Sequence, residues 1–390
     1  MTGPAALYLH IPFCAHKCAY CDFYSITRRE LLPPFIDALL HEMAFYSENP
    51  PFGGFSVSTL YLGGGTPSLL TPAQWKKILL PLKDKFTLVQ DAEITLEANP
   101  GTAEMAHLSA YRRLGINRLS LGIQSFQPAD LARLSRLHNT AEAEQAIRLA
   151  RKAGFDNLSL DLIFAVPGQT VDAWRKTLDQ ALAFQPEHLS CYSLTIEPGT
   201  PLHRQVQQGQ VQPCDEELER ELFILTQETL QQAGYEQYEI SNYSLPGFRS
   251  RHNQAYWSGY PYLGLGPSAH SFDGHRRWWN VRDVDQYLRA VSTQGRAVAD
   301  TETLTTEQKK IESVLLGLRR VEGLPLAGLP FQAEKAAAAL AGIDDCGRPF
   351  QSSADNKLII QANDRLALSR EGLLLYNYVC EKLCSLITST

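Results

Sequence analysis

The chain has 390 residues, of which 44% are hydrophobic and 20% charged, enough apolar material for one large domain and a smaller one. Its formal net charge of −6 argues against a nucleic-acid-binding protein. No run of about 18 apolar residues and no signal-peptide pattern appears, so we expect a cytoplasmic protein without a membrane span. Peripheral membrane association stays open. Two arginine pairs, Arg276–Arg277 and Arg319–Arg320, are expected to be solvated surface residues.

Short apolar runs alternate with helical patterns over the first half of the chain. Strands are predicted at 6–13, 59–63, 93–97, 118–123, 157–164 and 188–194, and helices at 31–46, 72–86, 102–114, 141–153 and 171–183. Six β–α alternations favour parallel strands joined by right-handed crossovers. Polar residues lie near the strand ends, where barrel-like folds collect functional groups: His10, Glu97, Gln124 and Asp161. We therefore expect a partial (βα)6 TIM-like barrel, although periodicity alone also allows a doubly wound sheet.

The pattern changes after about residue 200. A helix is predicted at 216–233, a strand at 235–242, and an aromatic-rich segment follows at 250–279. Near the C-terminus we predict a helix at 307–319, then a hairpin turning at Ala362–Asp364 and a last helix from about Ser369. The predicted domains are a barrel core at 1–235, a barrel extension at 236–300, and a small α+β, winged-helix-like domain at 301–390 with a packing or lid role.

Three of the eight cysteines lie within eight residues, in the segment Cys14-Ala-His-Lys-Cys18-Ala-Tyr-Cys21. Thiolates ligate iron well, and three cysteines leave one iron of a four-iron cluster open. That iron can accept the amino and carboxylate groups of S-adenosylmethionine. The alternative is a zinc site with His16 as a further ligand, but the spacing and the preceding strand favour the iron–sulfur cluster. The other cysteines are expected to pack as small hydrophobic residues: Cys191, Cys214, Cys346, Cys380 and Cys384.

The segment YLHIPFCAHKCAYCDF resembles the cluster loop of the radical SAM superfamily. Its HIPFC lead-in resembles the oxygen-independent coproporphyrinogen III oxidase group, and the resemblance covers nearly the whole chain. It implies a [4Fe-4S] cluster on Cys14, Cys18 and Cys21 and a radical SAM barrel. It also implies that Tyr8 and Tyr20 lie near the cofactor, with the Tyr20 ring near the adenine. The alternative for both tyrosines is packing in the core.

A glycine run, GGGTP at 63–67, ends the second predicted strand. Glycines have no Cβ, so a ligand can approach the backbone closely. The run resembles the superfamily motif that meets the methionyl amino group, which implies binding roles for Gly64, Gly65 and Thr66.

Four further residues match family positions that contact S-adenosylmethionine: Glu97, Gln124, Arg136 and Asp161. A carboxylate can accept from ribose hydroxyls or the amino group, and an arginine can pair with the methionine carboxylate. Arg136 is expected on the helix after strand four. The alternative for Glu97 and Arg136 is a structural ion pair.

Three departures separate the chain from true coproporphyrinogen dehydrogenases. Those enzymes carry a further cysteine where this chain has Phe23, and a longer arm before the cluster than the 13 residues here. The chain also carries an HNxxYW motif at 252–257. All three features resemble the HemW heme chaperone subgroup, which implies binding of heme, transfer to heme-accepting respiratory enzymes, and no coproporphyrinogen dehydrogenase activity.

The motif also offers groups for heme itself. Neutral imidazole suits iron, so His252 is a candidate axial ligand, with His270 as a second candidate. Tyr256 and Trp257 could form a flat apolar wall for a porphyrin. The alternative for His252 is a hydrogen-bonded core residue.

Three functions therefore stay in competition. The first is a heme chaperone that retains a cluster and S-adenosylmethionine. The second is an oxygen-independent coproporphyrinogen III oxidase of porphyrin biosynthesis, which decarboxylates its substrate by radical chemistry. The third is a radical SAM enzyme acting on another substrate. No catalytic residue is assigned.

Overall fold

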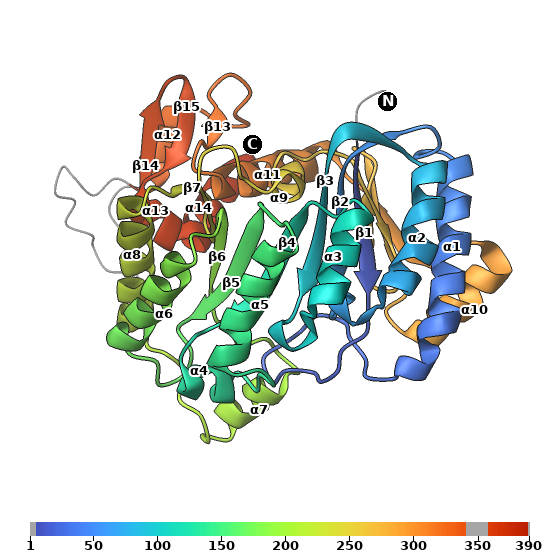
Figure 1. Cartoon of the computed structure of the whole chain (residues 1–390). Helices are drawn as coiled ribbons and strands as arrows, with labels where there is room; N and C mark the ends of the chain where they lie inside the picture. The colour runs from blue at the N-terminus through green and yellow to red at the C-terminus, as the bar shows by residue number, and fades with distance from the viewer. Residues whose placement is uncertain (1–4, 341–357, 389–390) are drawn as a thin grey trace.

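The computed structural model describes residues 5–340 and 358–388 (Figure 1). All six predicted strands are present: β1 (Ala5–Ile11), β2 (Ser56–Gly64), β3 (Thr87–Ala98), β4 (Arg118–Gln124), β5 (Leu158–Phe164) and β6 (His188–Ser193). They pair in parallel, each with the next in the chain. A doubly wound sheet would reverse its strand order, so the barrel-like α/β alternative is confirmed.

The predicted helices connect these strands and lie along one face of the sheet (Figure 1): α1 (Leu32–Glu48), α2 (Pro72–Lys85), α3 (Met105–Arg113), α5 (Thr140–Lys152), α6 (Val171–Ala183) and α8 (Glu216–Gln232). Local chemistry fixes where several begin. In α2, Thr71 and Gln74 form a reciprocal capping box ahead of Pro72. Short helices that the sequence did not predict follow strand ends: η1 (Arg29–Leu31), η2 (Pro67–Leu69), η3 (Pro100–Thr102), α4 (Pro128–Arg133) and α7 (Pro201–Gln207).

The sheet continues on both sides of the six parallel strands. The strand predicted at 235–242 is a hairpin of β7 (Glu236–Glu239) and β8 (Asn242–Ser244), and β8 pairs with β6. Beside β1 lies a parallel strand that the sequence did not resolve, β9 (Tyr262–Leu265), followed by β10 (His270–Phe272), β11 (Arg276–Asn280) and β12 (Val298–Thr303). Two helices belong to this extension, α9 (Arg251–Trp257) and α10 (Val284–Gln294).

The C-terminal region combines helices with a small antiparallel sheet: α11 (Thr306–Arg319), β13 (Leu324–Pro325), α12 (Ala333–Ala339), β14 (Ile359–Ala362), β15 (Arg365–Leu368), α13 (Arg370–Leu374) and α14 (Tyr376–Thr388). The predicted hairpin is confirmed, and Asn363 and Asp364 supply its positive φ angles of 50° and 57°. One hydrophobic cluster runs from β1 to α14, so this region shares its core with the barrel. The three domain boundaries stay predictions, and Cys346 lies outside the described residues.

One arginine pair is placed differently from the prediction. Arg319 and Arg320 are half-buried where the barrel meets the C-terminal region, and Arg319 pairs at 2.8 Å with the fully buried Glu239. The expectation of a solvated pair is wrong here, because Arg319 packs over the Trp257 ring and Arg320 donates to Ser258. In the described part of the chain, no helix is long and apolar enough to cross a membrane.

A buried carboxylate on α1 holds the β9–β12 extension to the barrel. Glu42 accepts hydrogen bonds from the Tyr287 hydroxyl at 2.7 Å, the Gly266 amide at 2.8 Å and the Asn280 amide at 2.6 Å. These donors belong to α10, the loop after β9, and β11. Burial raises the pKa of Glu42 to about 7, although all three hydrogen bonds oppose that shift.

Replacing Glu42 with Gln should destabilise the fold by about 2 kcal/mol. The glutamine NH2 group would face one of the hydrogen-bond donors that now meet a carboxylate oxygen. Wild-type stability should also fall as pH rises from 4.5 to about 7, because the unfolded chain ionises Glu42 first. That part of the pH dependence should vanish in the variant. Urea unfolding across this pH range measures both effects. Glu48→Gln, at the exposed end of α1, is the control, and equal stability of the two variants would contradict the role of Glu42.

Candidate metal-cluster and cofactor site

A cavity of about 540 Å³ opens at the carboxyl ends of the parallel strands. It brings together eleven of the predicted site residues: Cys14, Cys18, Tyr20, Cys21, Gly64, Gly65, Thr66, Glu97, Gln124, Arg136 and Asp161. They come from five strand ends and the loops that follow, because sequential parallel strands deliver their ends to one mouth. Two predicted residues, Tyr8 and His252, do not line the cavity.

The cysteine loop leaves the end of β1 and folds over this mouth. The Cys14 amide donates to the Ile26 carbonyl at 2.9 Å, and the Cys21 amide donates to the Cys18 carbonyl at 3.2 Å. Two donors meet the thiols: the Thr66 hydroxyl lies 3.5 Å from the Cys14 Sγ, and Arg136 Nη1 lies 3.5 Å from the Cys18 Sγ. Burial raises the pKa of the Cys21 thiol. Donors beside sulfur favour the thiolate form that binds iron.

The glycines after β2 have no room for side chains. A Cβ on Gly65 would lie 2.7 Å from the Phe13 carbonyl oxygen and 3.0 Å from the Cys14 Sγ. Gly64 has a φ of +113°, and a Cβ there would lie 2.8 Å from the His10 ring. The glycine run therefore permits the close approach of the cysteine loop to β2.

The donor set fits an iron–sulfur cluster better than zinc. Within residues 5–340 and 358–388, no three His, Cys, Asp or Glu side chains converge as a single ion requires. A four-iron cluster takes one thiolate per iron, so its ligands need not converge on one point. His16 is exposed on the loop. Two buried guanidinium nitrogens at the cavity, Nε of Arg118 and of Arg136, have no partner in the described residues and suit an anionic group such as a carboxylate.

Two buried carboxyl groups face the same cavity. Glu97 accepts from the Tyr61 hydroxyl at 2.8 Å and the Gly64 amide at 3.1 Å, and burial raises its pKa to about 7. Asp161 accepts from the Ser120 hydroxyl at 3.0 Å, and burial raises its pKa also. Buried carboxyls with raised pKa values suit hydroxyl and ammonium groups of a ligand.

Arg136 differs from its prediction in two respects. It does not lie on a helix, because α4 ends at Arg133 and Ser135 adopts a φ of 55°. Nor does it pair with Glu97: its Nη2 donates to the Asn99 Oδ1 at 2.6 Å and the Gly122 carbonyl at 2.9 Å. The turn aims the guanidinium into the cavity, so the structural ion-pair alternative is not formed.

His252 and Tyr8 pack below the cavity. His252 is 1% exposed, with Nδ1 2.9 Å from the Thr59 hydroxyl and Nε2 3.0 Å from the Tyr256 hydroxyl. Burial lowers the pKa of His252 to about 3. This geometry is that of the hydrogen-bonded core residue, and it leaves neither nitrogen open to a heme iron. The Tyr8 hydroxyl contacts the His10 Nδ1 at 3.1 Å instead of the cavity. His270 is exposed on β10 and stacks on Trp279.

Sequence reasoning missed three residues of the site. Arg118 is 2% exposed and reaches the cavity from the start of β4, Asn99 joins Arg136 to Thr66, and Tyr61 holds Glu97. A charged residue opening the apolar run RLSLGI was a readable signal, because an arginine there must be buried with partners or a ligand. Asn99 and Tyr61 carried no such signal.

Comparisons with known proteins agree with this geometry. The radical SAM superfamily model matches residues 8–181. The chain is 37% identical to the heme chaperone HemW of Synechocystis sp., covering 97% of this chain and 96% of that protein. It is 34% identical to HemW of Bacillus subtilis, with 95% and 97% covered. Among solved structures, the Escherichia coli coproporphyrinogen III oxidase HemN superposes with a TM-score of 0.82 at 25% identity, over 98% of this chain and 91% of that chain.

The fold, the cysteine loop and the match to the superfamily model together identify this chain as a member of the radical SAM superfamily. Within it, the chain belongs to the HemW heme chaperone family, with relatives that match from end to end. Membership in the superfamily implies a [4Fe-4S] cluster and S-adenosylmethionine, whose reductive cleavage is the chemistry that the pair supplies when bound.

Replacing Gly65 with Ala should prevent most cluster incorporation and cost about 1–3 kcal/mol of stability, because the new methyl group overlaps the Phe13 carbonyl and the Cys14 thiol. Iron content and visible absorption after anaerobic reconstitution measure the effect. Gly101→Ala, where a Cβ meets nothing within 4 Å, is the matched control. Full iron content in Gly65→Ala would contradict the close approach.

Glu97 should make S-adenosylmethionine binding pH-dependent. Its carboxyl has a pKa of about 7, so it is protonated below that pH and ionised above it. We expect the affinity to rise with pH, by up to about tenfold per unit below the pKa, because the ionised form accepts from ligand donors. Calorimetry of wild type and Glu97→Gln over the same pH range isolates the part of the pH dependence that Glu97 causes. The ligand's own titration affects both proteins equally. Glu104→Gln, at an exposed position, is the control. If the affinity of Glu97→Gln changed with pH as steeply as that of wild type, the role of Glu97 in binding would be refuted.

Proposed function

We propose that this protein is a heme chaperone that binds heme, holds a [4Fe-4S] cluster on Cys14, Cys18 and Cys21, binds S-adenosylmethionine, and delivers heme to respiratory enzymes. The observation that carries the proposal is the end-to-end similarity to HemW proteins of distant bacteria. These relatives are named heme chaperones, and the function proposed here is theirs. Cytoplasmic location and transient contact with membrane-bound recipients belong to the same proposal.

The cofactor roles follow the cavity's chemistry. The three thiols are the proposed ligands, and the unpartnered Arg136 Nε suits the methionine carboxylate. Gly64, Gly65 and Thr66 offer backbone and hydroxyl groups to the amino end, while Glu97 and Asp161 would accept from the amino group and ribose. Tyr20 borders the same cavity and Gln124 ends β4 with a φ of 66°, a conformation found where backbone turns into a site.

The second candidate is a coproporphyrinogen III oxidase, favoured by the HemN-like fold. One local feature opposes it. Phe23 stands where the dehydrogenases of this group are expected to carry a cysteine, and its side chain is 70% exposed at the cavity rim. A phenyl ring cannot ligate iron or exchange hydrogen as a thiol can.

The test loads the anaerobically reconstituted protein with heme, removes the excess, and records the Soret band. The loaded protein is then mixed with membranes containing a heme-free respiratory enzyme. Retention followed by transfer and recovered enzyme activity is the expected result. A parallel incubation with coproporphyrinogen III, S-adenosylmethionine and reductant should form no protoporphyrinogen IX. Absence of a retained Soret band, or porphyrin turnover, would replace the chaperone proposal with the enzymatic one.

His252→Ala belongs in the same experiment. Because both ring nitrogens are bonded inside the protein, we expect the variant to lose stability while its Soret maximum stays unchanged. A shifted Soret maximum in a folded variant would instead identify His252 as an axial ligand.

A further inference from the structure

A second large cavity lies at the other end of the barrel. It has a volume of about 520 Å³ and lies between α9, the β9–β11 strands and α11. Four aromatic side chains border it: Tyr256, Trp257, Tyr262 and Phe272. Figure 1 shows α9 and α11 where the parallel strands begin, opposite α4 and α7. This volume is within the range of ligand pockets, about 300–1,000 Å³.

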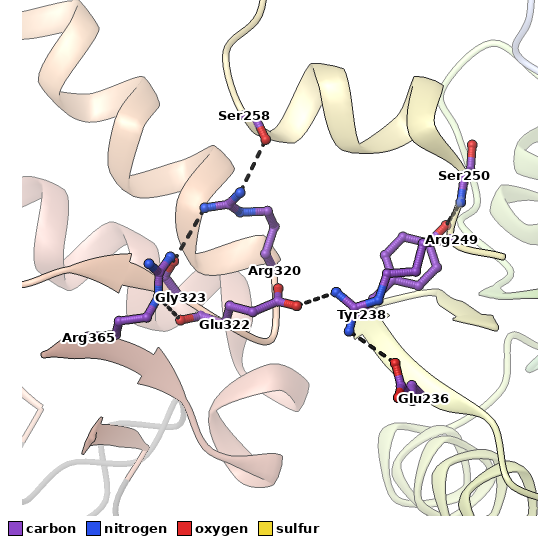
Figure 2. Close-up of polar contacts among 9 residues, drawn as sticks. All are labelled: Glu236, Tyr238, Arg249, Ser250, Ser258, Arg320, Glu322, Gly323 and Arg365. Atoms are coloured by element: carbon purple, nitrogen blue, oxygen red, sulfur yellow. Dashed lines mark hydrogen bonds and ion pairs between the residues drawn. The ribbon is translucent and has the colours of Figure 1, made fainter. Parts of the chain in front are cut away.

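A polar cavity of about 260 Å³ adjoins the aromatic one, and Trp257 and Arg320 border both. Figure 2 shows its side chains: Arg320 and Arg365 lie around Gly323, and Arg249 faces Glu322. The two spaces together form a groove with an aromatic part, also bordered by Lys309 and the Arg277–Glu312 ion pair, and a cationic end. We call it the α9 groove, defined by Tyr256, Trp257, Phe272, Arg320 and Arg365.

The cationic end of the α9 groove has more positive than negative charge. Arg249 pairs with both Glu236 and Glu322, so that three arginines face two glutamates. Arg320 donates to the Ser258 hydroxyl at 3.1 Å and the Gly323 carbonyl at 3.5 Å. Arg365 donates to the Glu322 and Gly323 carbonyls at 2.7 and 2.6 Å. Neither Arg320 nor Arg365 forms an ion pair within the described ranges 5–340 and 358–388, so both can still pair with carboxylates.

Trp257 has features of a binding wall. The Arg319 guanidinium covers its ring at 4.4 Å, which fixes the indole at the joint between barrel and C-terminal region. The Trp257 Nε1 and the Arg320 Nε are buried without a partner in the part of the chain that the structure describes. Unpaired buried donors are costly, and a ligand acceptor would satisfy them.

We propose that the α9 groove is the heme site, with the macrocycle against Trp257 and its aromatic neighbours and the propionates on Arg320 and Arg365. This inference rests on the proposed heme chaperone function and adds the place where heme binds. Heme is a flat apolar ring with two carboxylates on one edge, which matches an aromatic cavity continuous with an arginine pocket.

The groove predicts how heme is held. Among the residues that the structure describes, none bordering the two cavities is a histidine, cysteine or methionine. Burial raises the pKa of both Tyr256 and Tyr262, which disfavours phenolate ligation. The affinity would therefore come from contacts of the macrocycle face and of the propionates, rather than from a strong protein–iron bond. This mode of binding suits a carrier that must release its heme. Iron-free protoporphyrin IX should accordingly bind about as tightly as heme.

The test titrates heme, protoporphyrin IX and protoporphyrin IX dimethyl ester into holo wild type and variants, followed by absorption and tryptophan fluorescence. The double variant Arg320→Ala/Arg365→Ala should lose at least about tenfold in affinity for both diacids. It should bind the dimethyl ester as wild type does, because the ester has no carboxylates to pair. Ester binding thus also reports that the variant is folded. Arg113→Ala/Arg175→Ala, which removes two exposed arginines from α3 and α6, is the charge-matched control.

Trp257→Ala should weaken all three ligands, and Trp257→Phe should restore most of the loss by keeping an aromatic wall. S-adenosylmethionine should not displace heme, since the cofactor cavity and the α9 groove share no bordering residue. Heme retained by wild type and equally tightly by every variant, or displaced by S-adenosylmethionine, would overturn the groove while leaving the chaperone function intact. A wild type that retains no heme would instead refute the proposed function itself.

Discussion

Parallel pairing of β1 with β2 is the constraint on which the cofactor site depends. The register places His10 opposite Gly63 and Ile11 opposite Gly64. Beyond the strands the ladder continues, with the Gly65 amide on the Ile11 carbonyl and the Thr66 amide on the Phe13 carbonyl, each at 2.8 Å. These bonds bring the glycine run against the cysteine loop. A side chain at Gly65 would part the two strands' ends, so the ligand loop and the proposed amino-binding loop form one unit.

The interior that this pairing creates is lined by charged and polar side chains. Glu97 and Asp161 have raised pKa values because burial disfavours their charged forms, while Arg118 nearby works in the opposite direction. Such groups are costly in an empty apolar barrel and are stabilised when a polar ligand meets them. The fold thus supports a cavity already arranged for a zwitterionic cofactor, with cationic and carboxyl groups on different strand ends.

Helix α9 connects this cavity with the groove proposed for heme. The amides of Arg251 and His252 both donate to the Glu93 carboxylate at 3.0 Å, which fixes the start of the helix on β3. From that anchor Asn253 borders the cofactor cavity, whereas Tyr256 and Trp257 border the groove. His252 lies between them, bonded to Thr59 and Tyr256. The HNxxYW motif can therefore be understood as one wall shared by two sites, with its histidine as the internal support.

The sequence by itself determined the six β–α units, the cysteine spacing, the glycine run and the strand-end polar groups. Each of these features depends on a pattern of a few neighbouring residues. Capping residues and the Asn363–Asp364 turn were local also. Only the tertiary structure decided the rest. Strands β9–β12 have three to six residues, which is too short to show the alternation of apolar and polar residues typical of a strand. They form because they extend the sheet beside β1. Three features depend on partners about 40 to 190 residues away, where a local pattern carries no information: the orientation of His252, the pairing of Arg136 with Asn99, and the burial of Arg319 against Glu239.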